Sequence, residues 1–243
     1  MSTPGDFFIS TPDGPLAAVL HLPEKIPAPA VVCCHGLQSS KNSEKFIAIC
    51  EELCHAGLAA LRFDFTGCGE SRTLPDRHLL ATRMRDLDRV MDYVFHQAWF
   101  NGECGILGSS LGGYLALLVA ATGIYPVRGL VCMAAPFDLE KLRQRHPETM
   151  QPDELSGGEG KRAVPMTLEG ISSVPGVLIL HGERDESVPW MDATEIYRRV
   201  GEPKQLLIVQ AAEHRFLDPH CRRLAIGLSR QWLSKRLLGA IAS

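Results

Sequence analysis

One short stretch, Gly108-Ser-Ser-Leu-Gly112, constrains the fold of this chain more than any other. It has the pattern G-x-S-x-G and lies between an apolar segment ending at Leu107 and the small, apolar run 115–121. This context predicts a buried strand before the pattern and a helix after it. Because the chain must bend sharply there, a Cβ atom at position 108 or 112 would collide with neighbouring backbone. The turn would leave the hydroxyl of Ser110 exposed at the end of the strand.

The rest of the chain alternates between short apolar runs and amphipathic runs. Strands are predicted at about 7–10, 16–22, 30–34, 58–64, 128–135, 176–180 and 205–209, and helices at about 43–56, 79–97, 191–200 and 221–238. The alternation predicts right-handed βαβ units in a mostly parallel, doubly wound α/β sheet with helices on both faces. Ligands bind beyond the carboxyl ends of the strands in such sheets, and the polar motifs of this chain follow strands.

The length and composition fit one domain. The chain has 243 residues, of which 45% are hydrophobic and 22% charged, and no linker divides it. We therefore expect a single α/β domain over residues 1–243. The polar segment at about 138–173 interrupts the alternation and is interpreted as a small cap insertion. Its glycine-rich part, Ser156-Gly-Gly-Glu-Gly160, lacks the following Lys-Ser/Thr of a phosphate-binding loop and is interpreted as a turn.

The charge and the cysteine content indicate which classes of binding partner and which cellular compartment to expect. The net charge of −3 gives no reason to expect nucleic acid as a partner, and no stretch reaches the ~18 apolar residues of a membrane span. The N-terminus lacks the features of a signal peptide. Cys50 and Cys54 are four apart on a predicted helix, but no matching His/Cys pair follows, which argues against zinc. We expect a cytoplasmic protein with reduced cysteines and neither metal nor organic cofactor.

Two later motifs add the groups that a serine nucleophile needs. Asp185 lies in His181-Gly-Glu-Arg-Asp-Glu-Ser-Val-Pro189, after one apolar strand, and His214 lies after the last one. A serine hydroxyl attacks well only when a neutral imidazole takes its proton, and a carboxylate fixes the tautomer of that imidazole. The pattern around Ser110 is that of a nucleophile elbow, and the chain order Ser, Asp, His is the one found on α/β-hydrolase sheets.

Each of these assignments has a rival. Ser110 could be only a tight-turn serine. Rivals for the acid are Glu183, Glu186 and Asp138, and the rival for the base is His220. Asp185 is preferred for its offset from the strand end. His214 is preferred because His220 falls within the start of the last predicted helix.

Backbone N–H groups complete the predicted site. The N–H of Leu111, at the start of a helix, and that of Leu37, in His35-Gly-Leu37, are the predicted oxyanion donors. His35 and His181 are each expected to hydrogen-bond loop backbone. Asp64, with Gly67 and Gly69, is expected to organise a loop, and Cys68 in that loop is expected to be inert.

The motifs together carry a family resemblance. They are His35-Gly-Leu-Gln, Asp64-Phe-Thr-Gly-Cys-Gly-Glu-Ser71, Gly108-Ser-Ser-Leu-Gly112, and His181 to Pro189 with His214 beyond. They span roughly residues 16–216, and the chain resembles an α/β-hydrolase of the compact esterase and serine-aminopeptidase-like group. His35-Gly-Leu-Gln-Ser-Ser-Lys and Arg62-Phe-Asp-Phe are similar to the cinnamoyl/feruloyl-esterase-like branch.

These observations predict a serine hydrolase that cleaves a small-molecule carboxylic ester, with Ser110 as nucleophile, His214 as base and Asp185 as acid. The segment 138–173 would form part of the pocket roof. An amide (as in an aminopeptidase), a thioester or a C–C bond would suit the same groups. A non-catalytic binding module on a hydrolase sheet is the alternative from another class, although it has no need for all three groups. The sequence gives no support for an oligomeric scaffold. It is compatible with a homodimer and does not determine the oligomeric state.

Overall fold

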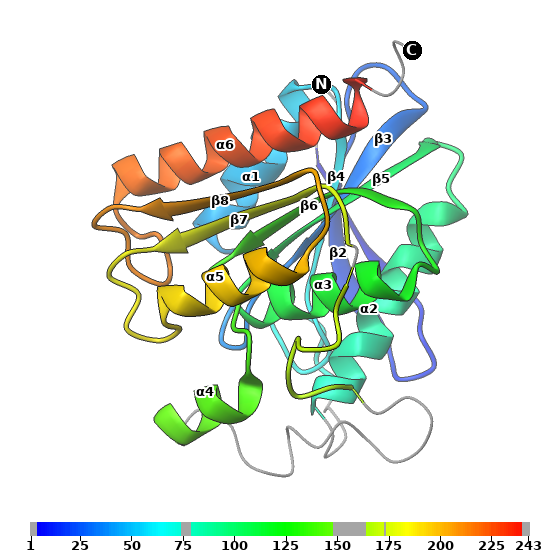
Figure 1. Ribbon diagram of the computed structural model, residues 1–243. Helices are drawn as coiled ribbons and strands as arrows, with labels where there is room; N and C mark the ends of the chain where they lie inside the picture. The colour runs from blue at the N-terminus through cyan, green and yellow to red at the C-terminus, as the bar shows by residue number, and fades with distance from the viewer. Residues whose placement is uncertain (1–3, 74–78, 148–163, 173, 240–243) are drawn as a thin grey trace.

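The apolar runs form one eight-stranded sheet in the computed structural model, which describes residues 4–73, 79–147, 164–172 and 174–239. The strand order is β1-β2-β4-β3-β5-β6-β7-β8 (Figure 1). The strands are β1 (Gly5–Ile9), β2 (Leu16–His21), β3 (Ala28–Cys34), β4 (Ala59–Phe63), β5 (Phe100–Ser109), β6 (Val127–Met133), β7 (Val177–Gly182) and β8 (Lys204–Val209). The helices are α1 (Glu44–His55), α2 (Leu79–Phe95), α3 (Leu111–Thr122), α4 (Leu139–Arg145), α5 (Trp190–Arg199) and α6 (Pro219–Leu237).

The pairing of the strands agrees with the predicted, mostly parallel sheet. β1 pairs with β2 and β2 with β4 in antiparallel fashion, and every pair from β4 and β3 through to β8 is parallel. The chain runs from β3 to its neighbour β4, and β5 then pairs with the opposite side of β3. This change of direction at β3 is the place where doubly wound sheets leave a crevice at the strands' carboxyl ends.

Helices cover both faces of the sheet, and alternate residues of each strand pack on opposite sides. Val32 and Cys34 of β3 belong to the core beneath α2, α3 and α5, whereas Val31 and Cys33 belong to the core beneath α1 and α6. Figure 1 shows α1 and α6 on one side of the sheet and α2, α3 and α5 on the opposite side. Strands buried on both faces are the reason that these runs are continuously apolar in the sequence.

The segment 138–173 contains a helix that its sequence pattern does not reveal. α4 is seven residues long, and among its residues only Leu139 is buried, so it has no apolar stripe to detect. Asp138 caps it by accepting a hydrogen bond from the Lys141 N–H at 2.9 Å. Residues 148–163 and 173, including the turn predicted at 156–160, lie outside the described residues. The assignment of residues 1–243 to a single domain stays a prediction.

The cysteines are unpaired and mostly buried. All eight cysteines lie within the described residues, and each is free. Cys50 and Cys54 face the interior on α1, and the Cys50 thiol lies 3.7 Å from that of Cys33 in the core.

In the described part of the chain, every helix is too short or too polar to span a lipid bilayer.

Candidate active site

The Gly108–Gly112 turn joins β5 to α3 as predicted, with Ser110 at its apex. Ser110 has φ 55° and ψ −124°, a strained conformation for a residue with a side chain, and costs of about 1–3 kcal/mol are typical. A Cβ on Gly108 would lie 2.4 Å from the Gly112 carbonyl oxygen, and one on Gly112 would lie 2.2 Å from that of Cys34. Both glycines are therefore required by close backbone packing. The Ser110 N–H donates to the Met133 carbonyl at 2.8 Å, which ties the strained turn to β6.

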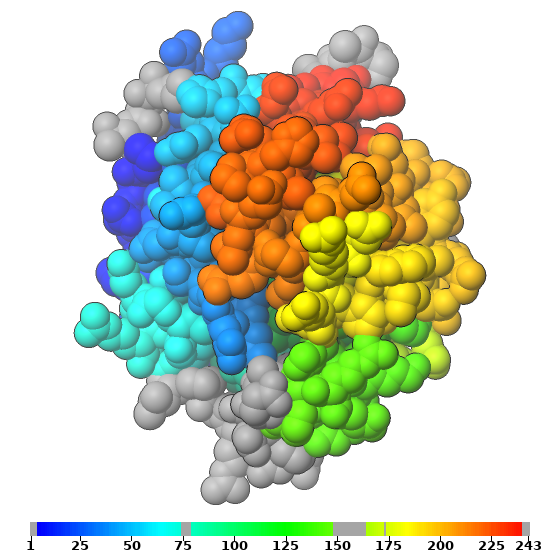
Figure 2. Space-filling view, turned by 90° about the vertical axis from the view of Figure 1, so that its left-hand side faces the viewer, coloured from blue at the N-terminus to red at the C-terminus, as the bar shows by residue number. Residues whose placement is uncertain are grey.

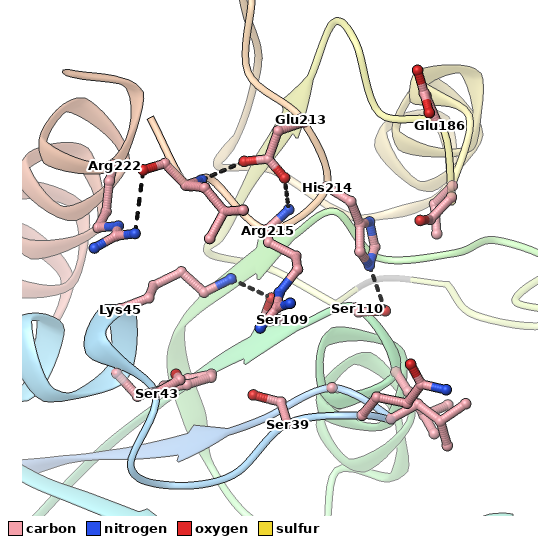
Figure 3. Close-up of a pocket in the computed structure, with 18 of the residues that line it drawn as sticks. Ser39, Ser43, Lys45, Ser109, Ser110, Glu186, Glu213, His214, Arg215 and Arg222 are labelled. Carbon is pink, nitrogen blue, oxygen red and sulfur yellow. Dashed lines mark hydrogen bonds between the residues drawn. The ribbon is translucent and has the colours of Figure 1, made fainter. Parts of the chain in front are cut away.

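The structure brings Ser110, His214 and Asp185 into one hydrogen-bonded row. His214 lies after β8, and its Nε2 is 3.2 Å from Ser110 Oγ (Figure 3). Its Nδ1 is 2.8 Å from Asp185 Oδ2, in the loop after β7. Because β5, β7 and β8 end at one edge of the sheet, their loops converge there. The carboxylate is in place to hold the proton on Nδ1, which leaves Nε2 free to accept the proton of the serine.

The Asp185 carboxylate is enclosed and fully engaged. Its side chain is 0% exposed. Oδ1 accepts hydrogen bonds from the N–H groups of Ser187 at 2.9 Å and Val188 at 2.8 Å. Burial alone would raise its pKa, but hydrogen bonds to His181 and His214 outweigh burial and hold the pKa of Asp185 well below its usual value. The group is therefore an anion at neutral pH.

His181 is a second imidazole on the same carboxylate, and the sequence analysis missed this contact. The side chain is completely buried, and Nε2 lies 3.2 Å from Asp185 Oδ2 and 2.9 Å from the Val188 carbonyl oxygen. Both neighbours are acceptors, so the proton resides on Nε2. Nδ1 has no hydrogen-bond partner among the described residues. The bond to loop backbone agrees with expectation, and the bond to Asp185 adds a positioning contact.

The rival residues are occupied elsewhere. Asp138 caps α4, and Glu183 accepts a hydrogen bond from the Ala211 N–H at 3.1 Å. Glu186 is exposed and points away from Ser110 in Figure 3. His220 is exposed in the first turn of α6. The geometry favours the preferred acid and base over all of these.

The loop after β3 packs directly against the serine. A Cβ built on Gly36 would lie 3.1 Å from that of Ser110. The Gly36 carbonyl oxygen lies 2.7 Å from His35 Nδ1, and Arg83 donates to the carbonyl oxygens of Gly36 at 3.4 Å and Leu37 at 3.0 Å. In a trans peptide the N–H points opposite to the C=O, so the Leu37 N–H points away from this buried cluster. That orientation leaves it available as an oxyanion donor.

Arg83 and His35 hold the loop from beneath. Burial lowers the pKa of His35 to about 4, so the ring is neutral, and it accepts a hydrogen bond from the Phe65 N–H at 3.1 Å. Arg83, on α2, is 2% exposed. The sequence analysis did not single out Arg83. A signal was present, since a charged residue three positions after Leu80 and four before Leu87 falls within the apolar stripe of the helix.

The Asp64 loop is structural, as expected. Asp64 is buried and accepts hydrogen bonds from the Lys41 backbone N–H at 2.7 Å, from its ammonium at 3.1 Å and from the Glu70 N–H at 3.0 Å. Gly69 has φ 48°, and a Cβ there would lie 2.2 Å from the Asp64 carboxylate. Burial raises the pKa of the Cys68 thiol despite the nearby Arg83, which agrees with an inert cysteine.

A cavity of about 980 Å³ opens above Ser110, and its walls come from several distant segments. Leu37, Leu111 and His214 line it, together with Leu142 and His146 from the α4 region. In Figure 2 the colours of residues near 40 (blue), 140 (green), 185 (yellow) and 215 (orange) meet on one face of the molecule. Part of the segment 138–173 therefore borders the cavity, as its predicted place in the pocket roof requires.

Comparisons with known proteins agree with this architecture. The family model described as alpha/beta hydrolase fold matches residues 29–153. Palmitoyl-protein thioesterase ABHD10, mitochondrial, from Rattus norvegicus is 28% identical over 236 residues, which cover 87% of this chain and 76% of that protein. Uncharacterized protein YfhR from Salmonella typhi is 29% identical over 163 residues, or 63% of this chain and 53% of that one.

Two solved structures show the same fold. Est1E from Butyrivibrio proteoclasticus, solved with ferulic acid bound, superimposes with a TM-score of 0.79 at 20% identity and covers 96% of this chain and 99% of its own. Alpha/beta hydrolase domain-containing protein 10 from mouse gives a TM-score of 0.72 at 24% identity, covering 95% of this chain and 99% of its own. At these identities the likeness concerns the fold.

Proposed function

Since the chain belongs to the α/β-hydrolase family, we propose that it is a serine hydrolase that cleaves a carboxylic ester through an acyl-enzyme intermediate. The single observation that carries the proposal is the hydrogen-bonded row Ser110–His214–Asp185, of which Ser110 and His214 line the cavity. A row of nucleophile, base and buried carboxylate has no use in a protein that only binds its ligand.

In the proposed reaction, Ser110 Oγ attacks the ester carbonyl as His214 Nε2 takes its proton. The N–H groups of Leu37 and Leu111 stabilise the oxyanion, each at a typical value of about 3–4 kcal/mol. His214 then gives its proton to the leaving alcohol. His214 next takes a proton from water, which attacks the acyl-serine carbonyl, and returns that proton to Ser110 Oγ as the acid leaves. Asp185 stabilises the imidazolium in both steps.

A thioester is the second candidate, and the relatives support it. The rat relative named as a palmitoyl-protein thioesterase matches over 87% of this chain. Thioesters and oxygen esters form the same tetrahedral intermediate, so the arrangement of Ser110, His214 and Asp185 accepts both. Est1E, by contrast, is described with ferulic acid bound, an aryl acid of the type released from an oxygen ester.

The first test is labelling with a fluorophosphonate, followed by peptide mass spectrometry. We expect one adduct, on Ser110, that is lost in Ser110→Ala and in His214→Ala but kept in Ser10→Ala, a matched change at an exposed serine. Turnover of matched aryl ester, thioester and anilide substrates then ranks the bond types. No labelling and no turnover by folded protein would refute the proposal and favour a non-catalytic binding module.

A further inference from the structure

Lys45 extends into the same cavity as the proposed nucleophile. It lies in the first turn of α1, and its ammonium donates a hydrogen bond to Ser109 Oγ at 2.8 Å (Figure 3). Ser109 immediately precedes Ser110 in the chain, and both line the cavity. A positive charge thus lies within one residue of the proposed site of attack.

The ammonium of Lys45 has no carboxylate partner among the described residues. Its other contacts are the rings of Phe46 and Phe216, each 5.8 Å from Nζ. Lys45 is partly buried. Lys41, which is fully buried, shows the contrasting case, because it pairs with Asp64 at 3.1 Å and Glu70 at 2.9 Å. Burying an ammonium without a counter-ion costs free energy that a bound anion would return.

The acidic side chains that border the cavity do not supply that counter-ion. Glu213 accepts hydrogen bonds from the backbone N–H groups of Arg215, at 2.6 Å, and Leu217. Glu44 is exposed and pairs with Arg222 at 2.6 Å. Glu186 is exposed and points away from Ser110. None of these carboxylates forms an ion pair with the ammonium of Lys45 beside Ser109.

Neighbouring groups also favour the binding of an anion beside Lys45. Ser43, the N-cap residue of α1, lines the cavity, and its buried hydroxyl has no hydrogen-bond partner among the described residues. The pKa of Lys45 is lowered to about 8, chiefly by burial; Arg215 and Arg222 contribute to the lowering, whereas Glu213 and Asp185 oppose it. An anion placed here would gain a cation, two hydroxyl groups and the end of a helix as partners.

We propose that the substrate carries an anionic oxygen group, a carboxylate or phosphate, and that the Lys45 ammonium and the Ser109 hydroxyl bind it beside the scissile ester. The inference rests on the proposed function, since it assigns a substrate class to the same cavity. The enzyme accordingly selects charged over neutral esters, and Lys45 is the residue responsible for the selection.

The test compares esters that differ only in charge. On the acyl side, 4-nitrophenyl hydrogen glutarate is compared with 4-nitrophenyl pentanoate; on the alcohol side, 3-carboxyphenyl butyrate and 3-phosphophenyl butyrate are compared with phenyl butyrate. The readout is the ratio of kcat/KM for the charged over the neutral ester in wild type, Lys45→Met and Lys25→Met. Lys25 is exposed before β3, at the opposite end of the strand from the cavity, and provides the matched control.

We expect the ratio to fall about 10- to 100-fold in Lys45→Met for at least one charged probe, and to stay unchanged in Lys25→Met. The probe that responds identifies the side and the type of anion. In wild type the ratio should also decline as the pH rises through about 8, where Lys45 loses its proton. A ratio equal in wild type and Lys45→Met on every probe would overturn the inference, while turnover of the neutral esters and labelling of Ser110 would still uphold the proposed function.

Discussion

Replacing Asp185 by Asn tests how the carboxylate acts in the proposed site. In the wild-type protein, the two carboxylate oxygens of Asp185 accept hydrogen bonds from four N–H groups. Two backbone N–H groups donate to Oδ1, and His214 and His181 donate to Oδ2. An amide has one acceptor oxygen. When that oxygen accepts the backbone N–H groups, the amide NH₂ faces both imidazoles. The NH₂ group and the imidazole N–H groups are all donors, so no hydrogen bond can form between them.

The two histidines respond to this conflict differently. His181 needs its Nε2 proton for the Val188 carbonyl, so its bond to residue 185 is lost. His214 can move its proton from Nδ1 to Nε2 and accept a hydrogen bond from the amide. Nε2 would then donate toward Ser110 and could not take the serine proton. We expect kcat to fall about 10⁴-fold, the size typical of this change in a Ser-His-Asp site.

The same substitution changes the stability in a pH-dependent way. Losing the bond to His181 costs about 1.5–3 kcal/mol of unfolding free energy, because the acceptor is charged. The pKa of Asp185 is lower in the folded protein than in the unfolded chain, so its stabilising effect is present above pH 4 and fades as the pH falls further. Asn does not titrate, so the gap between wild type and Asp185→Asn should narrow on acidification.

Steady-state kinetics at pH 7 and urea unfolding at pH 7 and pH 3 measure both effects. Circular dichroism of the variant at pH 7 shows whether it is folded before kcat is compared. A kcat within tenfold of wild type would refute the role of the carboxylate in fixing the His214 tautomer. A stability gap that is equal at the two pH values would refute its role as a buried, hydrogen-bonded anion.

Two other sites give predictions of different kinds. Arg83→Lys should lower kcat about 10- to 100-fold with little change in KM, because a lysine cannot bind the carbonyl oxygens of Gly36 and Leu37 at the same time. An unchanged kcat in folded protein would speak against this positioning role. Gly112→Ala should lower the unfolding free energy by at least about 1–3 kcal/mol, since its Cβ would lie 2.2 Å from the Cys34 carbonyl oxygen. Gly227→Ala in α6, with no atom within 4 Å of the new Cβ, should instead raise it by about 0.5–1 kcal/mol, and urea unfolding of both variants checks the opposite signs.

The sequence was sufficient to predict the parts of the site that local rules determine. The elbow follows from two glycines between a strand and a helix, and the loops with Asp185 and His214 follow from the rule that parallel strands end at one edge. Each of these predictions depends on residues near one another in the chain or on sheet topology alone.

The supporting contacts lay beyond such rules. Lys45 meets Ser109 across 64 positions of sequence, and Arg83 meets Leu37 across 46. Whether these side chains touch depends on how α1 and α2 are tilted against the sheet, which no periodicity encodes. His181 was assigned to loop backbone for the same reason: its second partner appears only when the loop folds back over four residues to bring Asp185 beside it.

The bond between Ser110 and His214 joins residues 104 positions apart, so the proposed mechanism has a consequence for folding. Closing so long a loop costs chain entropy, and the intervening strands β6, β7 and β8 must be in place before the imidazole reaches the serine. Helices and local turns can form much earlier. Under the proposed mechanism, catalytic competence is therefore among the last properties that the chain acquires during folding, and turnover would report on the complete sheet rather than on the elbow alone.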